Sequence, residues 1–359
     1  SDGTDITTWS DFSGNANDFT QSDNSFTPRY YTNEINGFPI VRFEQANGRL
    51  IHNNFDDFPT GNLTALYVNK NNGESGDGVL SYASSASDND LLLFSSNSLQ
   101  VYRPSSTSSS VSFNDNAWHI ANVTWQNSNG ALSVWKDGTQ SFSTTGFASG
   151  TTISTGGNLA LAGEQDAING SYAESQAHQG DFAEVIIYNQ TLVSAQSIIV
   201  QNYLSAKYDI ALTANDVYNE DDGANGDFDY EVAGIGRIGA SDQHLDAKGS
   251  GIVRVNNPQD LDDEEFFMWG HDNAPLEARS TDVPGGVLRR FNRVWRVSEV
   301  NRSAVAVDVG AVDISFDLTG LGNVDVDDLV LMIDADGTFA IAATQVTGAV
   351  HDGGNVYRF

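Results

Sequence analysis

The stretch from Gly180 to Tyr208 constrains the fold more than any other part of the chain, because a strand pattern passes directly into a helix pattern. It reads GDFAEVIIYNQTLVSAQSIIVQNYLSAKY. Residues 180–188 are largely apolar on both alternating faces, which predicts a strand covered on both sides. After it, apolar residues recur at helical spacing, at Leu192, Ala195, Ile199, Tyr203 and Ala206. No other segment predicts a convincing helix, so this stretch predicts the junction between two domains.

Short β-rich segments bounded by Gly, Asn and Pro fill the rest of the chain. Those of the first half lie at 40–43, 63–68, 79–82, 91–94, 118–125, 131–135, 139–142 and 159–162. The serine-rich segment 105–110 is interpreted as an exposed loop. Strands at this spacing without helices between them predict an antiparallel sandwich. Further strand patterns follow residue 210, among them 230–235, 265–269 and an alternating run over 305–316. We therefore expect an all-β protein with domains over 1–210 and 211–359.

The strong negative charge is the main signal in the composition. The chain of 359 residues has 17 Lys and Arg against 48 Asp and Glu, a net charge of −31. Such a field repels nucleic acid and anionic lipid and attracts divalent cations. Two compatible interpretations are adaptation to a saline or extracellular setting and a set of carboxylate calcium sites. The chain has no cysteine, hence no disulfide framework, and no apolar run of membrane-spanning length.

Several motifs of the first half resemble the laminin-G/concanavalin-A-like lectin-type family found in large secreted bacterial adhesins. They are WSDFSGN at 9–15, NGFPIVRF at 36–43, WH at 118–119, WKDG at 135–138 and GDFAEVIIY at 180–188 with its trailing helix. The resemblance implies a jelly-roll sandwich with one C-terminal helix over residues 1–210. It does not specify a function, because one fold serves binders and spacers alike.

The second half resembles an uncharacterised β domain that follows such lectin-like modules. The matching segments are EVAGIG at 231–236, FFMWGHD at 266–272, RVWRV at 293–297 and LMIDADG at 331–337. The resemblance implies a second β-sandwich domain and a secreted, multi-domain adhesin or polysaccharide-handling protein. Because the chain starts at Ser1 and has methionine only at positions 268 and 332, we expect it to be a piece of a longer protein.

The sequence shows no clear catalytic constellation. Glycosidases of this architecture need two carboxylates across the sugar, and the strand at 180–188 offers Glu184 without a second acid two positions away. The acidic run 262–265 is more typical of a solvated edge. No nucleophile elbow, zinc-protease motif or phosphate loop is present, and the histidines lack metal-ligand spacing. We therefore expect no enzymatic activity.

The turn around Gly14 is the first candidate for a calcium site. Asp11 and Asn15 offer oxygen ligands, and Gly14 lets backbone carbonyls turn inward. The family resemblance implies that this turn lies near the strand that carries Asp181, with a structural calcium between them. Asp11, Asn15 and Asp181 are thus the predicted metal ligands. The alternative is a plain Asx turn, with Asp181 capping a strand end.

Two other charged clusters of the second half are weaker candidates. The loop 221–229 is similar to an EF-hand loop, but with Gly226 as the central glycine its third and twelfth positions are Gly223 and Val232, which supply no carboxylate. The basic cluster of Arg289, Arg290, Arg293 and Arg296 is interpreted as interdomain or core-edge ion pairs rather than an anion site.

The polar loop 163–179 is the first candidate for a ligand site, because binding groups of rigid sandwiches lie on such loops. Sugars are held by an apolar ring beside fixed hydrogen-bonding groups, and the loop supplies Tyr172 together with Glu164, Gln165, Asp166 and Asn169. The second choice is the acidic turn with Asp88 and Asp90. Further candidates for stacking on a sugar are Tyr82, Tyr102, Trp125 and Trp135. For each of them the alternative is a position in the hydrophobic core.

These features predict an extracellular or cell-surface module that binds a glycan or cell-surface ligand with the help of calcium. It would bind no nucleic acid and insert into no membrane. A polysaccharide-degrading enzyme or its accessory module is the first alternative. A structural spacer, or a region that binds peptides or proteins, is the second.

Overall fold

The computed structural model describes residues 2–45, 47–71, 76–103, 105–322 and 324–359. Over these residues the chain divides into two compact units, one comprising Ser1–Leu192 and Tyr208–Thr213, the other Val193–Lys207 and Ala214–Phe359. This division assigns the long helix to the second unit, whereas the sequence placed it at the end of the first domain. The all-β class expected from the sequence is confirmed, and every strand pair between the named strands is antiparallel.

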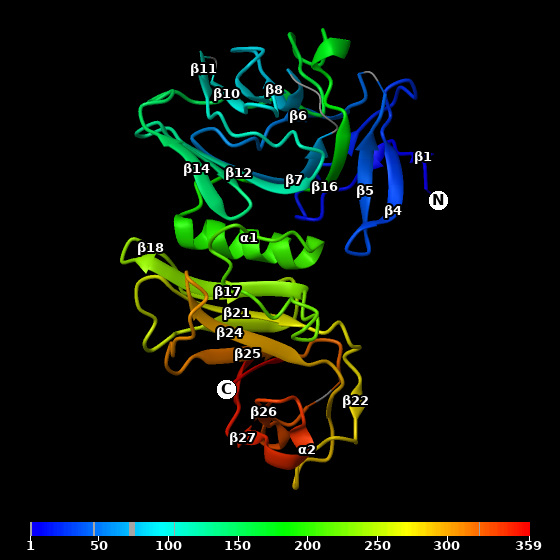
Figure 1. The fold of residues 1–359 in the computed structure, drawn as a ribbon. Coiled ribbons are helices and arrows are strands. Elements are labelled where there is room, and N and C mark those ends of the chain that lie inside the picture. Colours follow the sequence, from blue (N-terminus) through cyan, green and yellow to red (C-terminus); the bar gives the residue numbers. More distant parts are fainter. Residues whose placement is uncertain (1, 46, 72–75, 104, 323) are drawn as a thin grey trace. The chain divides into compact units, whose positions relative to one another are not determined.

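Two sheets, each eight-stranded over the described residues, form the sandwich of the first unit (Figure 1). Sheet A has the order β1 (Thr4–Asp5), β4 (Arg29–Ile35), β5 (Phe38–Phe43), β16 (Gly180–Tyr188), β7 (Asn62–Asn71), β12 (Trp118–Gln126), β13 (Ala131–Lys136) and β14 (Thr139–Thr144). Sheet B has the order β11 (Ser105–Ser108), β10 (Gln100–Arg103), β9 (Leu91–Phe94), β8 (Gly78–Ala83), β15 (Gly157–Leu161), β6 (Leu50–Phe55), β3 (Phe19–Thr20) and β2 (Thr8–Trp9).

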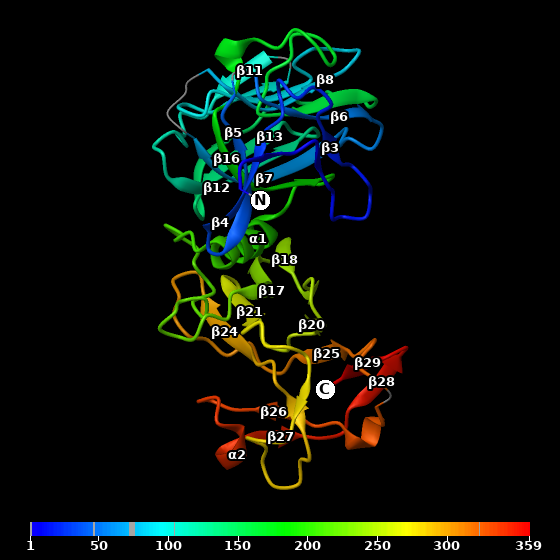
Figure 2. The ribbon, with the colours of Figure 1, turned by 90° about the vertical axis from the view of Figure 1, so that its right-hand side faces the viewer.

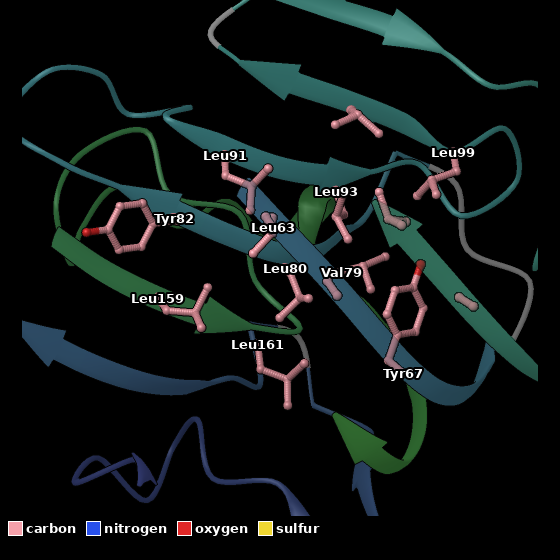
Figure 3. Packing of buried hydrophobic residues seen from close by; sticks show 14 of the residues in the cluster. Leu63, Tyr67, Val79, Leu80, Tyr82, Leu91, Leu93, Leu99, Leu159 and Leu161 are labelled. Carbon is pink, nitrogen blue, oxygen red and sulfur yellow. The ribbon is translucent and has the colours of Figure 1, made fainter. Parts of the chain in front are cut away.

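The core of this sandwich consists of the inward side chains of both sheets (Figure 3). Leu63 and Tyr67 on β7 meet Leu80 and Leu93 of the opposite sheet, all nearly inaccessible to solvent. Each buried side chain of this size contributes about 1.5–3 kcal/mol to folding. The crossovers that place sequentially distant strands next to each other, such as β16 between β5 and β7, are typical of a jelly roll.

Two local predictions for the first unit were wrong. The serine-rich segment 105–110 is not a free loop, because Ser105–Ser108 pairs with β10 as the edge strand β11. The simple alternation assigned to 180–188 also fails, because a bulge lies between Phe182 and Glu184 in the pairing with β7. The bulge brings Phe182, Val185 and Ile187 to the same core. An inserted residue reverses the side-chain alternation beyond it.

The second unit is a smaller sandwich of two sheets (Figure 2). Sheet C contains β18 (Asp242–His244), β17 (Tyr230–Gly239), β21 (Glu265–His271) and β24 (Trp295–Asn301). Sheet D contains β19 (Asp246–Lys248), β20 (Val253–Asn256), β25 (Asp313–Asp317), β29 (Val356–Arg358) and β28 (Val350–Gly353). Short pairs complete it: β22 (Ala278–Arg279) with β23 (Arg290–Phe291), and β26 (Leu331–Ile333) with β27 (Thr344–Val346). The short helix α2 (Phe339–Ala342) lies in the same unit.

The predicted strand over 305–316 was correct only at its end, where β25 begins at Asp313. Asp308 accepts a hydrogen bond from the Gly310 amide, and Gly310 has a φ of +72°. This turn stops the strand because a left-handed residue cannot continue an extended chain.

The helix α1 (Ser194–Tyr208) packs on sheet C within the second unit. Ala195, Ile198 and Ile199 are buried together with Phe266 and Met268 of β21. Asp242, the first residue of β18, caps the helix, because its carboxylate accepts hydrogen bonds from the amides of residues 194 and 195 at 3.1 and 2.8 Å. The predicted helix is therefore present, and its apolar stripe serves the second unit.

Candidate functional site

The loop that connects β15 to β16 is closed at its base by backbone contacts. Ala162 donates to Val79 O at 3.0 Å, and the amide of His178 donates to Ala162 O at 3.0 Å. Ala177 forms a parallel bridge with Gly78, the first residue of β8. Residues 163–177, which we call the site loop, thus leave sheet B and return to it at neighbouring points. The loop contains a short 3₁₀ turn, Glu174–Gln176.

Gln165 fixes the first part of the site loop to sheet B. Its amide nitrogen donates to Ser81 O at 2.7 Å and to Asn158 O at 2.8 Å, while its side-chain oxygen accepts from the Asn169 amide at 3.0 Å. The side chain is fully buried. The side chain of Gln165 therefore anchors the site loop to sheet B.

Glu164 lies against the start of β8. A Cβ atom added to Gly78 would lie 2.6 Å from the Glu164 amide nitrogen, so the two backbones touch. Glu164 is only 3% exposed. Burial, and then the charges of Asp166 and Asp88, raise the pKa of Glu164 to about 7. The structure therefore brings together acids from both predicted ligand segments.

The turn between β8 and β9 holds the second of these segments. Asp90 is buried and anchors the turn, because its Oδ2 accepts from the Ser84 hydroxyl at 2.6 Å and from the Ser154 amide at 2.9 Å. Asp88 is exposed, and its Oδ1 accepts from the Asn89 amide at 2.9 Å. Asp90 therefore positions the turn, whereas Asp88 is available to a ligand.

Two buried oxygens near these acids have no hydrogen-bond donor among the described residues, namely Glu164 Oε2 and Asn89 Oδ1. Buried polar atoms are nearly always paired with protein, water or an ion. We call Asp88, Asn89, Glu164 and Asp166 the acidic site. Its carboxylate and amide oxygens are the ligand types that calcium takes in proteins. No trio of acidic or histidine side chains in the described parts of the chain is already close enough to hold a metal.

Asn89 and Phe94 were not predicted from the sequence. Asn89 lies inside the acidic turn already identified, so only its buried oxygen is new. Phe94 pairs across the β8–β9 hairpin with Gly78, the residue on which Glu164 lies. The ring of Phe94 meets that of Tyr102 edge to face at a centroid distance of 6.2 Å. Both rings are partly exposed, so an aromatic pair flanks the acidic site.

Tyr172, predicted to stack on a sugar, is instead in contact with an arginine. The guanidinium of Arg49 lies 3.9 Å from the centre of the Tyr172 ring and 4.0 Å from that of Phe26. Burial raises the pKa of Tyr172 to about 12. One face of this ring is thus occupied by a cation–π contact that fixes the site loop. Tyr82, Trp125 and Trp135 are buried, which was the alternative considered for them.

The predicted metal ligands Asp11, Asn15 and Asp181 are distributed over both sheets. Asp11 and Asn15 lie between β2 and β3 of sheet B, whereas Asp181 lies on β16 of sheet A. Asp11 Oδ1 accepts from the Ser13 amide at 2.7 Å, the hydrogen bond of an Asx turn. Both oxygens of Asp181 accept from Arg42, at 2.6 and 2.9 Å. The Asx turn matches the alternative interpretation of Asp11, whereas Asp181 pairs with Arg42 instead of capping a strand end.

The arginine cluster of the second unit forms ion pairs within that unit. Arg290 pairs with Asp282 at 2.7 Å, and Arg296 pairs with Glu220 at 3.0 Å. Arg293 lies 3.6 Å from Glu231. The ion pairs of these three arginines therefore agree with the core-edge interpretation. Neither helix within the described ranges has the length and hydropathy needed to cross a bilayer.

Comparison with known families gives two matches, one in each half of the chain. Residues 49–216 match the model of the Pentaxin family, and residues 196–358 match a domain of unknown function, DUF8202. The first range includes the whole acidic site. The two ranges overlap over residues 196–216, which include most of helix α1.

Among particular proteins, the chain is similar to C-reactive protein 1.4 of Limulus polyphemus, with 34% identity over 76 residues, 21% of this chain and 31% of that protein. It is also similar to the human neuronal pentraxin receptor, with 32% identity over 92 residues, 26% of this chain and 18% of the receptor. The chain thus spans less than a third of these relatives. A heptameric SAP-like pentraxin from Limulus polyphemus aligns with a TM-score of 0.37 and 21% identity over 44% of this chain and 76% of that one.

Proposed function

We propose that the first unit is a calcium-dependent binding module whose ligand site is the acidic site together with the Phe94–Tyr102 pair. The observation that carries this proposal is the buried carboxylate of Glu164, whose Oε2 has no donor among the described residues while Asp88 and Asp166 add negative charge beside it. Without a cation, this arrangement disfavours ionisation of Glu164. A bound divalent ion would pair the orphaned oxygens and neutralise the repulsion.

Asp88, Asn89, Glu164 and Asp166 would hold the ion. Calcium supplies a positively charged centre that can coordinate hydroxyl or anionic oxygens of a ligand. The site loop positions Glu164 and Asp166 through Gln165, and the hairpin turn positions Asp88 and Asn89 through Asp90. All four residues lie within the range that matches the Pentaxin family.

We further propose that the ligand is a glycan or a similar polar group on a cell surface, in an extracellular setting. Sugar recognition combines an apolar ring with fixed polar groups. Phe94 pairs with Gly78, on which Glu164 lies, and the ring of Tyr102 contacts that of Phe94. The net charge of −31 suits a saline environment and disfavours nucleic acid. In this proposal the chain is not an enzyme, and the second unit supports or positions the first.

Calorimetric titration with calcium, followed by a glycan array with and without chelator, tests the proposal. The expected result is a calcium-dependent rise in melting temperature that is lost in Glu164→Gln and retained in the matched variant Asp11→Asn. The reverse pattern would place the ion in the turn around Asp11. Calcium-independent melting and an array without signal would leave the spacer alternative.

A specific observation also supports the enzyme alternative. A carboxyl group with a pKa of about 7 beside ionised carboxylates is the arrangement of a general acid in glycoside hydrolysis. However, Glu164 is 3% exposed, which leaves little access for a glycosidic oxygen. Release of reducing sugar from polysaccharides, abolished by Glu164→Gln, would favour the enzyme over the binding module.

A further inference from the structure

A buried histidine–aspartate pair lies at the base of the site loop. His178 is fully buried, and its Nδ1–H donates to Asp77 Oδ2 at 2.6 Å, while Asp77 is 1% exposed. The His178 ring also lies 5.0 Å from the ring of Phe182 in the core. Neither residue belongs to the acidic site, so the binding chemistry proposed above does not account for this buried hydrogen bond.

The carboxylate of Asp77 joins several segments. Its Oδ1 accepts from both the amide and the hydroxyl of Ser96 at 2.9 Å, and its Oδ2 accepts from Asn71 at 3.2 Å. Although burial acts to raise it, the hydrogen bonds from His178 and Ser96 hold the pKa of Asp77 below its ordinary value. Asp77 is therefore a satisfied anion that connects the end of β7, the start of β8 and the turn after β9.

This pair is connected to the acidic site through two short paths of backbone. Asp77 directly precedes Gly78, on which Glu164 lies and which pairs with Phe94. His178 directly follows Ala177, which bridges Gly78 and ends the site loop. A displacement of His178 would thus release the C-terminal end of the loop from β8, whereas Gln165 would still hold its N-terminal end.

From this geometry we infer that Asp77 and His178 are a positioning pair, which holds the site loop on β8 and thereby sets the affinity of the acidic site for calcium. That the pair holds the site loop on β8 is inferred from the geometry alone. Its effect on calcium affinity rests on the proposed function. Residues that orient metal ligands from outside the coordination sphere typically change metal affinity about 10–100-fold when they are replaced.

The test compares His178→Gln with His119→Gln. His119 is a matched control, because it is also buried, belongs to the same unit and pairs with Asp137 at 2.7 Å, but it lies on β12 of sheet A. Two quantities are measured below the melting transition, namely hydrogen exchange of residues 163–177 without calcium and the dissociation constant for calcium by calorimetry.

His178→Gln should speed exchange in residues 163–177 at least tenfold and weaken calcium binding at least tenfold. His119→Gln should leave both within about threefold of the wild type. Unchanged exchange of the site loop in His178→Gln, or equal loosening in His119→Gln, would overturn the inference.

Two further outcomes remain decisive. If the wild type binds no calcium, the proposed function fails and the exchange comparison alone decides the role of the pair. If His178→Gln does not fold, Ser96→Ala replaces it, because this variant removes the hydroxyl that donates to Asp77 and accepts from Asn71 but leaves the Ser96 amide bonded to Asp77. Ser96→Ala should then speed loop exchange at least fivefold, and exchange within threefold of the wild type would overturn the inference.

Discussion

Arg42 holds both carboxylate oxygens of Asp181, with its Nε 2.6 Å from Oδ1 and its Nη2 2.9 Å from Oδ2. Paired, two-point contacts of this kind are among the stronger ionic hydrogen bonds. The side chain of Asp181 is 6% exposed and that of Arg42 is 25% exposed. A metal ion at Asp181 would therefore have to displace a guanidinium that already satisfies the carboxylate.

We expect Asp181→Ala to lower the free energy of unfolding by roughly 1.5–3 kcal/mol, the range for a charge-assisted hydrogen bond. The rise of melting temperature with calcium should persist in this variant. Urea unfolding and thermal melting with and without chelator measure both effects. Loss of the chelator effect in Asp181→Ala would instead support the site predicted from the sequence at Asp11, Asn15 and Asp181.

The second prediction concerns pH. Because burial, with Asp166 and Asp88, raises the pKa of Glu164 from 4.5 to about 7, folding without calcium is relatively favoured below pH 4.5. This stability is lost as the pH rises through about 7, because the Glu164 carboxyl group gives up its proton at a lower pH in the unfolded state than in the folded state. The loss amounts to roughly 3 kcal/mol at about 1.4 kcal/mol for each pKa unit.

Urea unfolding between pH 4.5 and pH 8 measures this loss. Glu164→Gln should lack it, whereas the exposed control Glu277→Gln should retain it. Calcium should restore the stability of the wild type at the upper end of the range. A wild-type pH profile identical to that of Glu164→Gln would mean that Glu164 titrates normally.

The third prediction concerns the contact of Gly78 with Glu164. A methyl group at residue 78 would lie 2.6 Å from the Glu164 amide nitrogen and 2.7 Å from its Cβ, so the site loop must shift. Gly78→Ala should cost about 1–3 kcal/mol, the range for overpacking, and weaken calcium binding. Gly285→Ala is the matched control, because nothing lies within 4 Å of a Cβ at that position. Wild-type calcium affinity in Gly78→Ala would contradict the proposed site.

The fourth prediction concerns helix α1. Ile199 is 8% exposed and packs in the core of the second unit. Ile199→Ala should cost about 2–5 kcal/mol, the range for truncating a large core side chain. Ile341→Ala, at an 82% exposed position of the same unit, should cost less than about 0.5 kcal/mol. A similarly small cost at Ile199 would mean that the helix lies on the surface only.

The sequence by itself determined the all-β class, most strands of the first unit and the single long helix. These features depend on local patterns, because alternation and helical spacing record which faces are buried within one segment. Composition also located the polar loop 163–179 and the turn 88–90, since segments rich in carboxylates and amides do not form strands. Local pattern was misleading where a single residue changed it, as at the bulge after Phe182 and the turn at Gly310.

Only the tertiary structure decided which of these polar groups share a site. Glu164 and Asp88 are far apart in the sequence, and they interact because the site loop folds back over β8. The same folding placed Arg49 on one face of the Tyr172 ring and Arg42 on the carboxylate of Asp181, so both predicted site residues have partners within the chain. Such assignments depend on which cation or carboxylate lies nearest across strands and loops. That proximity is set by strand order and register, which no local pattern of residues records.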